Sequence, residues 1–110
     1  MSSLLPWMLL GLAGLFEIGW AIGLKYTEGF SRPLPSLLTV GSMAASLFLL
    51  GLALRHLPLG TAYAVWTGIG TLGTVAFGIL VLRESADPVR LLSVALILLG
   101  ILGLKIGLKP

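Results

Sequence analysis

Residues 16–25 read FEIGWAIGLK, and the acid within this stretch decides how the whole chain is interpreted. Glu17 lies inside a run that is otherwise apolar from Leu4 to Leu24. If that run crosses a membrane, a carboxylate near its centre costs about 2.5–3.5 kcal/mol on insertion scales. Such a cost has to be compensated, so Glu17 is expected to have a function.

The rest of the 110-residue chain is similarly apolar. Hydrophobic residues make up 57% and charged residues only 10%, with a mean hydropathy of +1.09. Soluble domains carry about 25% charged residues, so this chain lacks the charges for a solvated surface. Because a membrane-spanning helix needs about 20 apolar residues, the length allows four or five spans and no soluble catalytic domain.

Several other classes are disfavoured. The chain has no cysteine, which excludes disulfides and thiol metal sites. No nucleophile–base pair or set of metal ligands stands out, so we expect neither an enzyme nor a metal or cofactor. The seven Lys and Arg residues are scattered singly, which disfavours nucleic acid as a partner.

Charges and prolines divide the chain into four apolar segments, which predict helices at about 4–24, 35–54, 58–82 and 88–108. We expect a single four-helix transmembrane domain over residues 1–110, because only helices satisfy their own backbone in lipid. Pro58 suits the first turn of the third helix. Asp87 is typical of an N-cap, with Pro88 at the first helical position.

The basic residues are nearly balanced between the two membrane faces. Lys25, Arg32, Arg83 and Arg90 belong to the first and third loops, and Arg55, Lys105 and Lys109 to the opposite face. Orientation normally follows a clear excess of such residues on the cytoplasmic side. The chain could therefore insert both ways and form an antiparallel homodimer, or take one orientation with a weak bias.

Three of the predicted helices each carry a polar or aromatic face. In the first, Gly14 and Ala21 lie one turn on either side of Glu17, and Trp20 lies beside it. The second presents Thr39, Ser42 and Ser46, and the third presents Gly60, Tyr63, Thr67, Gly70 and Thr74, with Trp66 one turn from Tyr63.

If these faces converge, they enclose a carboxylate, hydroxyls and aromatic rings, which suits a small organic cation. We expect Gly14, Ser42 and Thr67 to line such a cavity. Alternatively, Ser42 or Thr74 could hydrogen-bond only to its own helix. The glycines at 68, 70 and 73 either bend the third helix or allow close packing.

The interiors of the predicted spans contain no Lys or Arg apart from Lys105, near the end of the fourth, so Glu17 has no evident permanent counter-ion. In a two-fold dimer, Glu17 would meet its symmetry mate. Two carboxylates in a low dielectric can hold protons or a cation, but hardly both at once. This mutual exclusion is the physical basis of antiport.

The fourth segment has a different pattern. Ser93, Gly100 and Gly107 recur every seven residues, with Gly103 alongside. Small residues at this spacing are typical of a close-packing seam between helices. Because the segment has no interior acid or aromatic ring, we expect it to serve dimerisation.

Taken together, the sequence resembles the small multidrug resistance transporters over essentially its whole length. The matching stretches are AGLFEIGW (13–20), LKYTEGFSRPLPS (24–36), LPLGTAYAVWTGIG (57–70) and the glycine pattern of the fourth segment. Within that family it is most similar to the guanidinium-exporter subtype, because Trp20 follows Glu17 by three residues and Trp66 is followed by Thr67 and Gly68. Gly19 and Gly23 are departures, since bulkier residues are common there.

The resemblance implies an antiparallel, dual-topology homodimer in a bacterial inner membrane that exchanges protons for guanidinium-type cations. It implies that Glu17 is the shared proton and cation site, with Trp20 and Ser46 as hydrogen-bond partners that orient it. Tyr63 would gate the substrate and Trp66 would line the pocket. Gly14 would be the small residue beneath the acid.

Two other functions remain open from the sequence. One is a multidrug exporter of quaternary ammonium compounds on the same fold, which would need no planar hydrogen bonding to its substrate. The other is a non-transporting accessory subunit of a larger membrane assembly.

Overall fold

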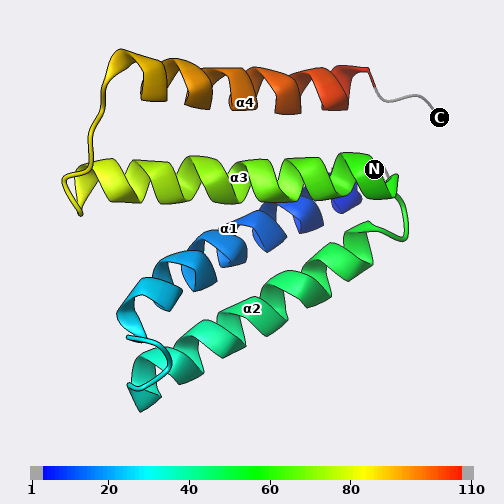
Figure 1. Cartoon of the computed structure of the whole chain (residues 1–110). Coiled ribbons are helices and arrows are strands. Elements are labelled where there is room, and N and C mark those ends of the chain that lie inside the picture. Colours follow the sequence, from blue (N-terminus) through cyan, green and yellow to red (C-terminus); the bar gives the residue numbers. More distant parts are fainter. Residues whose placement is uncertain (1–3, 108–110) are drawn as a thin grey trace.

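The structure, a computed structural model, describes residues 4–107 and consists of four long helices (Figure 1). They are α1 (Leu4–Tyr26), α2 (Pro33–Ala53), α3 (Leu59–Leu80) and α4 (Pro88–Ile106). Each is long and apolar enough to cross a membrane. The predicted all-helical fold with four apolar spans is therefore confirmed.

The helix ends differ from the predicted ones by a few residues. α1 continues to Tyr26, and α2 already begins at Pro33. Pro58 lies just before α3 instead of in its first turn; its backbone is extended and its carbonyl accepts the amide of Ala62 at 2.9 Å. α4 ends at Ile106 with Gly107 as its cap, and the predicted last residue, Leu108, lies outside the described residues.

The start of α4 is capped as the sequence predicts. The Asp87 carboxylate accepts the backbone amide of Arg90 at 2.9 Å, and Pro88 follows in the first turn. An N-cap side chain of this kind satisfies one of the amides that a helix start leaves without an internal partner.

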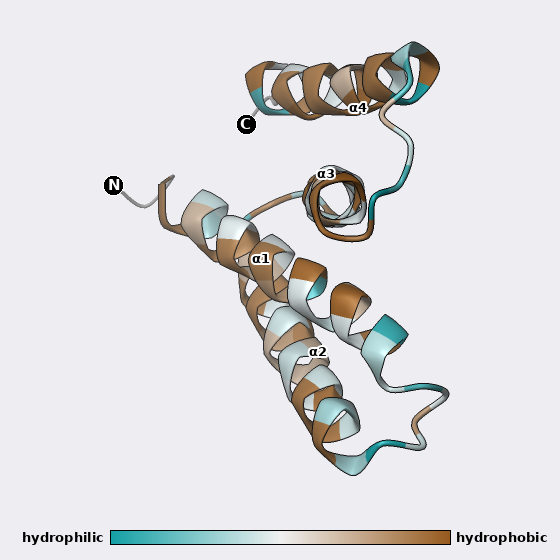
Figure 2. Cartoon of the chain, turned by 90° about the vertical axis from the view of Figure 1, so that its left-hand side faces the viewer, coloured by the Kyte–Doolittle hydropathy of each residue, from teal (hydrophilic) through white to brown (hydrophobic). Residues whose placement is uncertain are grey.

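Three of the helices share a small core, and the fourth lies outside it, against α3 (Figures 1 and 2). α1 packs against both α2 and α3, whereas among the described helices α4 packs only against α3. The buried hydrophobic side chains of this core come from the first half of α1, the end of α2 and the start of α3, and so gather at one end of the molecule. They are Leu10, Ala13, Leu50, Ala53, Ala62, Val65 and Trp66.

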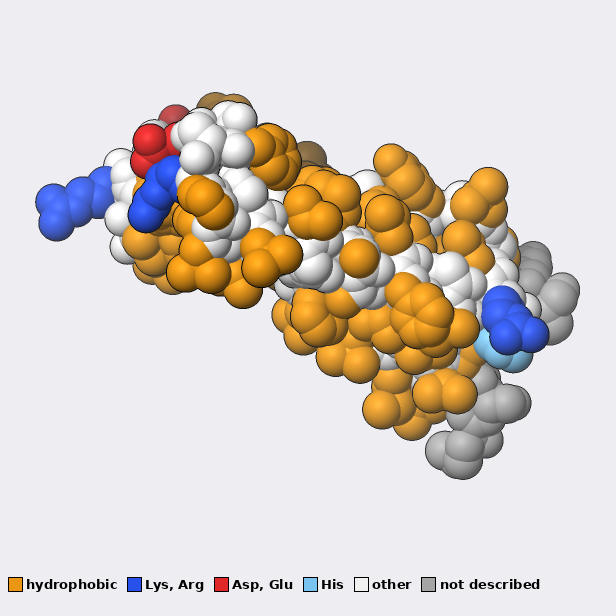
Figure 3. Space-filling model, turned by 90° about the horizontal axis from the view of Figure 1, so that it is seen from below, with side chains coloured by type: hydrophobic (Ala, Val, Ile, Leu, Met, Phe, Trp, Pro, Cys, Tyr) orange, Lys and Arg blue, Asp and Glu red, His pale blue; other side chains and the backbone are white. Residues whose placement is uncertain are grey.

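Large apolar side chains cover much of the surface, as Figure 3 shows for one face, and the charged groups seen there gather at the two ends. The exposed side chains include Phe48, Leu80 and Ile106. Soluble monomers rarely expose apolar patches beyond a few hundred square ångströms. The surface therefore fits a lipid environment with polar ends at the two membrane faces.

Candidate functional site

The carboxylate of Glu17 lies directly against the backbone of α3. A Cβ atom built on Gly70 would stand 2.6 Å from both Cδ and Oε1 of Glu17. Real Cβ atoms do not approach other atoms so closely, so the acid occupies space that only a glycine leaves open. The acid of α1 and Gly70 in the polar face of α3 are thus brought together.

The other glycines of α3 also lie at helix contacts. A Cβ on Gly68 would meet Ile101 of α4, and one on Gly73 would meet Ile18 of α1. Of the two interpretations open from the sequence, close packing accounts for these glycines.

Within residues 4–107, the Glu17 carboxylate has no protein group that neutralises it. Oε1 is buried and has no hydrogen-bond partner. The two ion pairs of this part of the chain, Glu28–Arg32 and Glu84–Arg90, lie elsewhere. A buried polar atom without a partner costs about 1–3 kcal/mol, which a bound proton or cation would relieve.

Ser46 links the three core helices close to the acid. Its hydroxyl is fully buried, donates to the Ala13 carbonyl at 2.7 Å and accepts the indole N–H of Trp66 at 2.9 Å. In an α-helix the carbonyl of residue 13 also receives the amide of residue 17. Ser46 therefore fixes the turn of α1 from which Glu17 projects.

Ser42 makes the corresponding contact one turn away on α2. Its hydroxyl donates across to the Phe16 carbonyl at 2.8 Å, the carbonyl that in an α-helix receives the amide of Trp20. Ser42 thus bonds to α1 and not to its own helix. The polar face of α2 holds the backbone that carries Glu17 and Trp20.

These contacts differ from the direct pairing with Glu17 that the family resemblance implied. Ser46 is engaged by Ala13 and Trp66, and the buried indole nitrogen of Trp20 has no hydrogen-bond partner among the described residues. In the single chain, Ser46 acts on the backbone beneath the acid. Sequence patterns could not reveal this, because the acceptors on α1 are carbonyls, which every residue carries.

The aromatic pair of α3 combines one buried and one open ring. Trp66 is 6% exposed and Tyr63 54% exposed, and their ring centres lie 5.5 Å apart at 55°. Three threonine hydroxyls on this helix bond only to it: Thr67 donates to the Tyr63 carbonyl at 2.9 Å, Thr71 to the Thr67 carbonyl at 2.8 Å and Thr74 to the Thr71 carbonyl at 3.1 Å.

The small residues of α1 allow its neighbours to approach. A Cβ on Gly14 would lie 2.6 Å from Cγ2 of Ile69, so this position serves the α1–α3 contact one turn from Glu17. Gly19 lies against the Ser42 hydroxyl, and Gly23 against that of Thr39. The two departures from the family pattern are therefore sites of close packing with α2.

The predicted seam of α4 is unoccupied in the single chain. Gly100 and Gly103 have no atom of another residue in their side-chain space, and Ser93 donates to its own helix at Val89, 2.8 Å away. A Cβ on Gly107 would meet only the Gly103 carbonyl. No residue of α4 is buried.

The sequence matches a known protein family and several named proteins. The model of the family described as Small Multidrug Resistance protein matches residues 5–97. The chain is 59% identical over 103 residues to proteins named guanidinium exporter from Escherichia coli O6:H1 and from Yersinia pseudotuberculosis, covering 94% of this chain and 98% and 99% of those proteins. A protein of the same name from Citrobacter freundii is 57% identical over the same length, with 94% of this chain and 98% of that protein covered.

A family match over this much of the chain, together with these identities, confirms the resemblance drawn from the sequence. The chain belongs to the small multidrug resistance family of membrane transporters, and not to a class of enzyme.

Proposed function

We propose that this protein is a proton-coupled antiporter that exports guanidinium or small substituted guanidinium cations across the bacterial inner membrane. The names of its relatives support this substrate, since proteins of three bacterial species that are 57–59% identical to it are called guanidinium exporters. Identity at this level extends over nearly the whole length of each chain.

The observation that carries the proposal is the state of Glu17. Its Oε1 is buried and has no hydrogen-bond partner within residues 4–107, inside a helix long and apolar enough to cross a membrane. A carboxylate in that position requires a proton or a cation. Because Glu17 binds either a proton or the cation, the transport of one is coupled to the transport of the other.

The remaining site residues orient the acid, line the pocket or gate it. Trp20 and Ser46 orient the acid, Ser46 by way of the α1 backbone that it holds. Trp66 lines the pocket, and Tyr63, whose ring is half exposed, gates it. Gly14, Ser42 and Thr67 complete the lining.

The working unit is an antiparallel, dual-topology homodimer in which both copies contribute Glu17. Two features support it. One is the near balance of basic residues between the two membrane faces, and the other is the open side-chain space at Gly100 and Gly103, within the predicted seam of Ser93, Gly100, Gly103 and Gly107. Inverted two-fold symmetry makes the inward-open and outward-open states equivalent, so the gradients set the direction.

Two protons entering for each monovalent cation leaving would move one net charge inward per cycle. A membrane potential of 100 mV then contributes about 2.3 kcal/mol. Each unit of pH difference contributes about 1.4 kcal/mol per proton.

Transport currents on a solid-supported membrane test the substrate class. We expect proteoliposomes to give currents with guanidinium and small alkylguanidiniums that exceed those with tetraalkylammoniums, because only the former donate planar hydrogen bonds to carboxylates. Larger tetraalkylammonium currents would favour the quaternary ammonium exporter. No proton-linked flux from the purified protein would favour an accessory subunit.

A further inference from the structure

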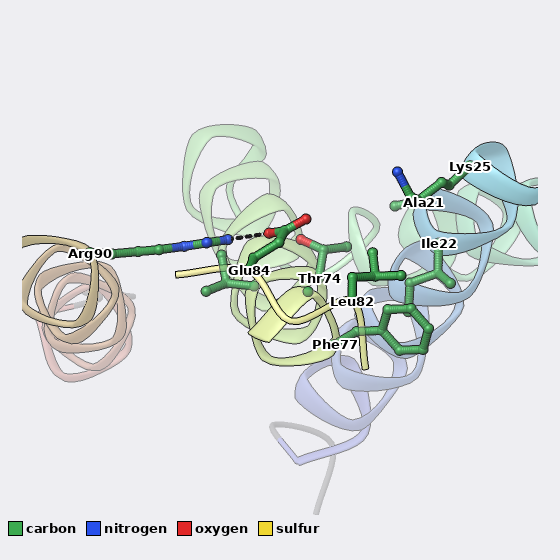
Figure 4. A pocket seen from close by; sticks show the side chains of 10 residues that line it. Ala21, Ile22, Lys25, Thr74, Phe77, Leu82, Glu84 and Arg90 are labelled. Carbon is green, nitrogen blue, oxygen red and sulfur yellow. Dashed lines mark hydrogen bonds and ion pairs between the residues drawn. The ribbon is translucent and has the colours of Figure 1, made fainter. Parts of the chain in front are cut away.

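A cavity of about 240 Å³ lies beside the site, between α1, α3 and the loop that leads to α4 (Figure 4). Its inner lining includes Ala21 and Thr74, which lie one helical turn beyond Glu17 and Gly70 respectively. α1 and α3 run in the same direction (Figure 1), so both steps lead toward the same end of the molecule. The cavity thus begins about one helical turn from the Glu17–Gly70 contact, on the side toward that membrane face.

The mouth of the cavity holds a guanidinium group of the protein itself. The Arg90 side chain reaches from α4 and donates from Nη2 to Oε1 of Glu84 at 2.7 Å (Figure 4). Its Nη1 donates to the Ser85 carbonyl at 3.0 Å. A carboxylate and a carbonyl together therefore receive two N–H groups of one planar guanidinium, a geometry that suits this cation in particular.

The acceptors are held in place by the chain around them. The Glu84 amide donates to the Gly78 carbonyl at 2.9 Å, and the Glu84 carboxylate lies in the space left open by the missing side chain of Gly78. Arg83, just before it, has a positive φ of 60°, which turns the loop back onto α3. Glu84 thus stays at the cavity mouth if Arg90 moves away.

We infer that Glu84 and the Ser85 carbonyl form a second guanidinium site at the cavity mouth, which Arg90 occupies until a guanidinium cation entering or leaving displaces it. This inference rests on the proposed function, since it concerns the same substrate on its way to or from Glu17. The site selects planar hydrogen-bond donors, because a tetraalkylammonium has no N–H to offer either acceptor.

The exposure of the pair favours such an exchange. The Arg90 and Glu84 side chains are 29% and 44% exposed, and exposed ion pairs contribute little to stability. Lys25 also lines the cavity, on the α1 side (Figure 4), so the two cations outnumber the single acid. This excess disfavours a further cation beside Arg90, and the substrate replaces the arginine instead of joining it.

The first test is the KM for guanidinium in proteoliposomes. Arg90→Gln removes the competitor, and we expect it to lower KM about threefold, in keeping with the small energy of an exposed pair. Arg90→Lys keeps the charge but cannot serve both acceptors in one plane, so its KM should fall between those of Arg90→Gln and the wild type. Glu84→Gln should raise the KM for guanidinium. In the double variant Glu84→Gln/Arg90→Gln, the KM should no longer be lowered as it is in Arg90→Gln alone.

Arg32→Gln is the matched control, because Arg32 belongs to the other loop at the same end of the molecule and pairs with Glu28 at 3.8 Å, away from the cavity lining. An effect through general surface charge would appear equally in Arg32→Gln and would vanish at about 1 M salt, where screening extends only some 3 Å. Equal shifts in the two variants would overturn the inference, whereas the absence of guanidinium currents from the wild type would instead overturn the proposed function.

The second test is independent of transport. In a Glu17→Gln background, guanidinium chloride is titrated while the NMR signals of the Gly78 and Glu84 amides are followed. We expect saturable chemical-shift changes in the double variant Glu17→Gln/Arg90→Gln. We expect none in the triple variant that also carries Glu84→Gln. Shifts that do not depend on residue 84, or no shifts in either protein, would show that the site does not exist.

Discussion

Glu17 and Gly70 occupy complementary positions on α1 and α3: the carboxylate of the one fills the side-chain space that the other leaves empty. This contact fixes where the acid lies relative to the third helix. It also makes a residue without a side chain part of the site.

Gly70→Ala should therefore impair transport. The new Cβ would stand 2.6 Å from the acid, and relaxing to an ordinary contact would move the carboxylate by about 0.8 Å. We expect the guanidinium current to fall about tenfold or more, since displacements of this order at a reactive site have large effects. Gly60→Ala is the control, because no other residue lies within 4 Å of that position. Equal currents in the two variants would contradict the importance of the contact.

Ser46→Ala should destabilise the protein and weaken transport. The substitution leaves the Trp66 indole N–H and the Ala13 carbonyl without their shared partner, at a cost of about 1–3 kcal/mol. Denaturant unfolding in detergent measures this cost. Ser36→Ala on the same helix is the control, because the Ser36 hydroxyl is buried with no hydrogen-bond partner among the described residues, and its loss should be close to neutral. An unchanged midpoint for Ser46→Ala would contradict the linking role.

Gly100→Ile tests the dimer seam on α4. No other residue of the single chain lies within 4 Å of the Gly100 Cβ position, so we expect the effect to arise between copies. Overfilling a packed interface costs about 1–3 kcal/mol, which corresponds to a loss of about 5- to 150-fold in dimer affinity. Subunit counting in bilayers measures it. Gly41→Ile on α2, which also has open space, should leave the dimer unchanged; equal effects of both would contradict the assignment of the seam.

Asp87 should respond to acid. The Arg90 backbone amide and the Ser85 hydroxyl donate to its carboxylate, and these hydrogen bonds lower the pKa of Asp87 below its usual range. The charged cap therefore stabilises the start of α4 above the unfolded-state pKa, and this contribution is lost as the pH falls through the lower, folded value. NMR titration in micelles should give a pKa for Asp87 below the usual range, together with weaker protection of the first α4 amides in acid. A pKa at or above the usual range would contradict the capping geometry.

Periodicity and composition were sufficient to predict the four helices, because apolar runs of this length have few alternatives in lipid. The cap at Asp87 was equally predictable, since its contact lies within four residues. The position of Glu17 against Gly70 and the links from Ser46 and Ser42 to α1 depend on how the helices cross. A single sequence does not reveal how the helices cross. The acceptors of Ser42 and Ser46 are backbone carbonyls, which every residue carries, so no residue type indicates these contacts.

The pairing of Arg90 with Glu84 at the cavity mouth could not be predicted from the sequence, for a different reason. Glu84 and Arg90 are six residues apart across a loop, so no helical spacing relates them. Only the turn at Arg83 and the open space at Gly78 bring the acid to the cavity.

Guanidinium-triggered proton release is the most direct test of whether the Glu17 carboxylate exchanges a proton for the substrate. Purified protein in weakly buffered detergent solution is mixed with saturating guanidinium while the pH is recorded. We expect the wild type to release protons on binding. We expect Glu17→Gln to release none and to lose guanidinium binding at residue 17, with proton-coupled uptake lost in the same variant. Undiminished release or coupled uptake in Glu17→Gln would place the exchange on another group and contradict the mechanism.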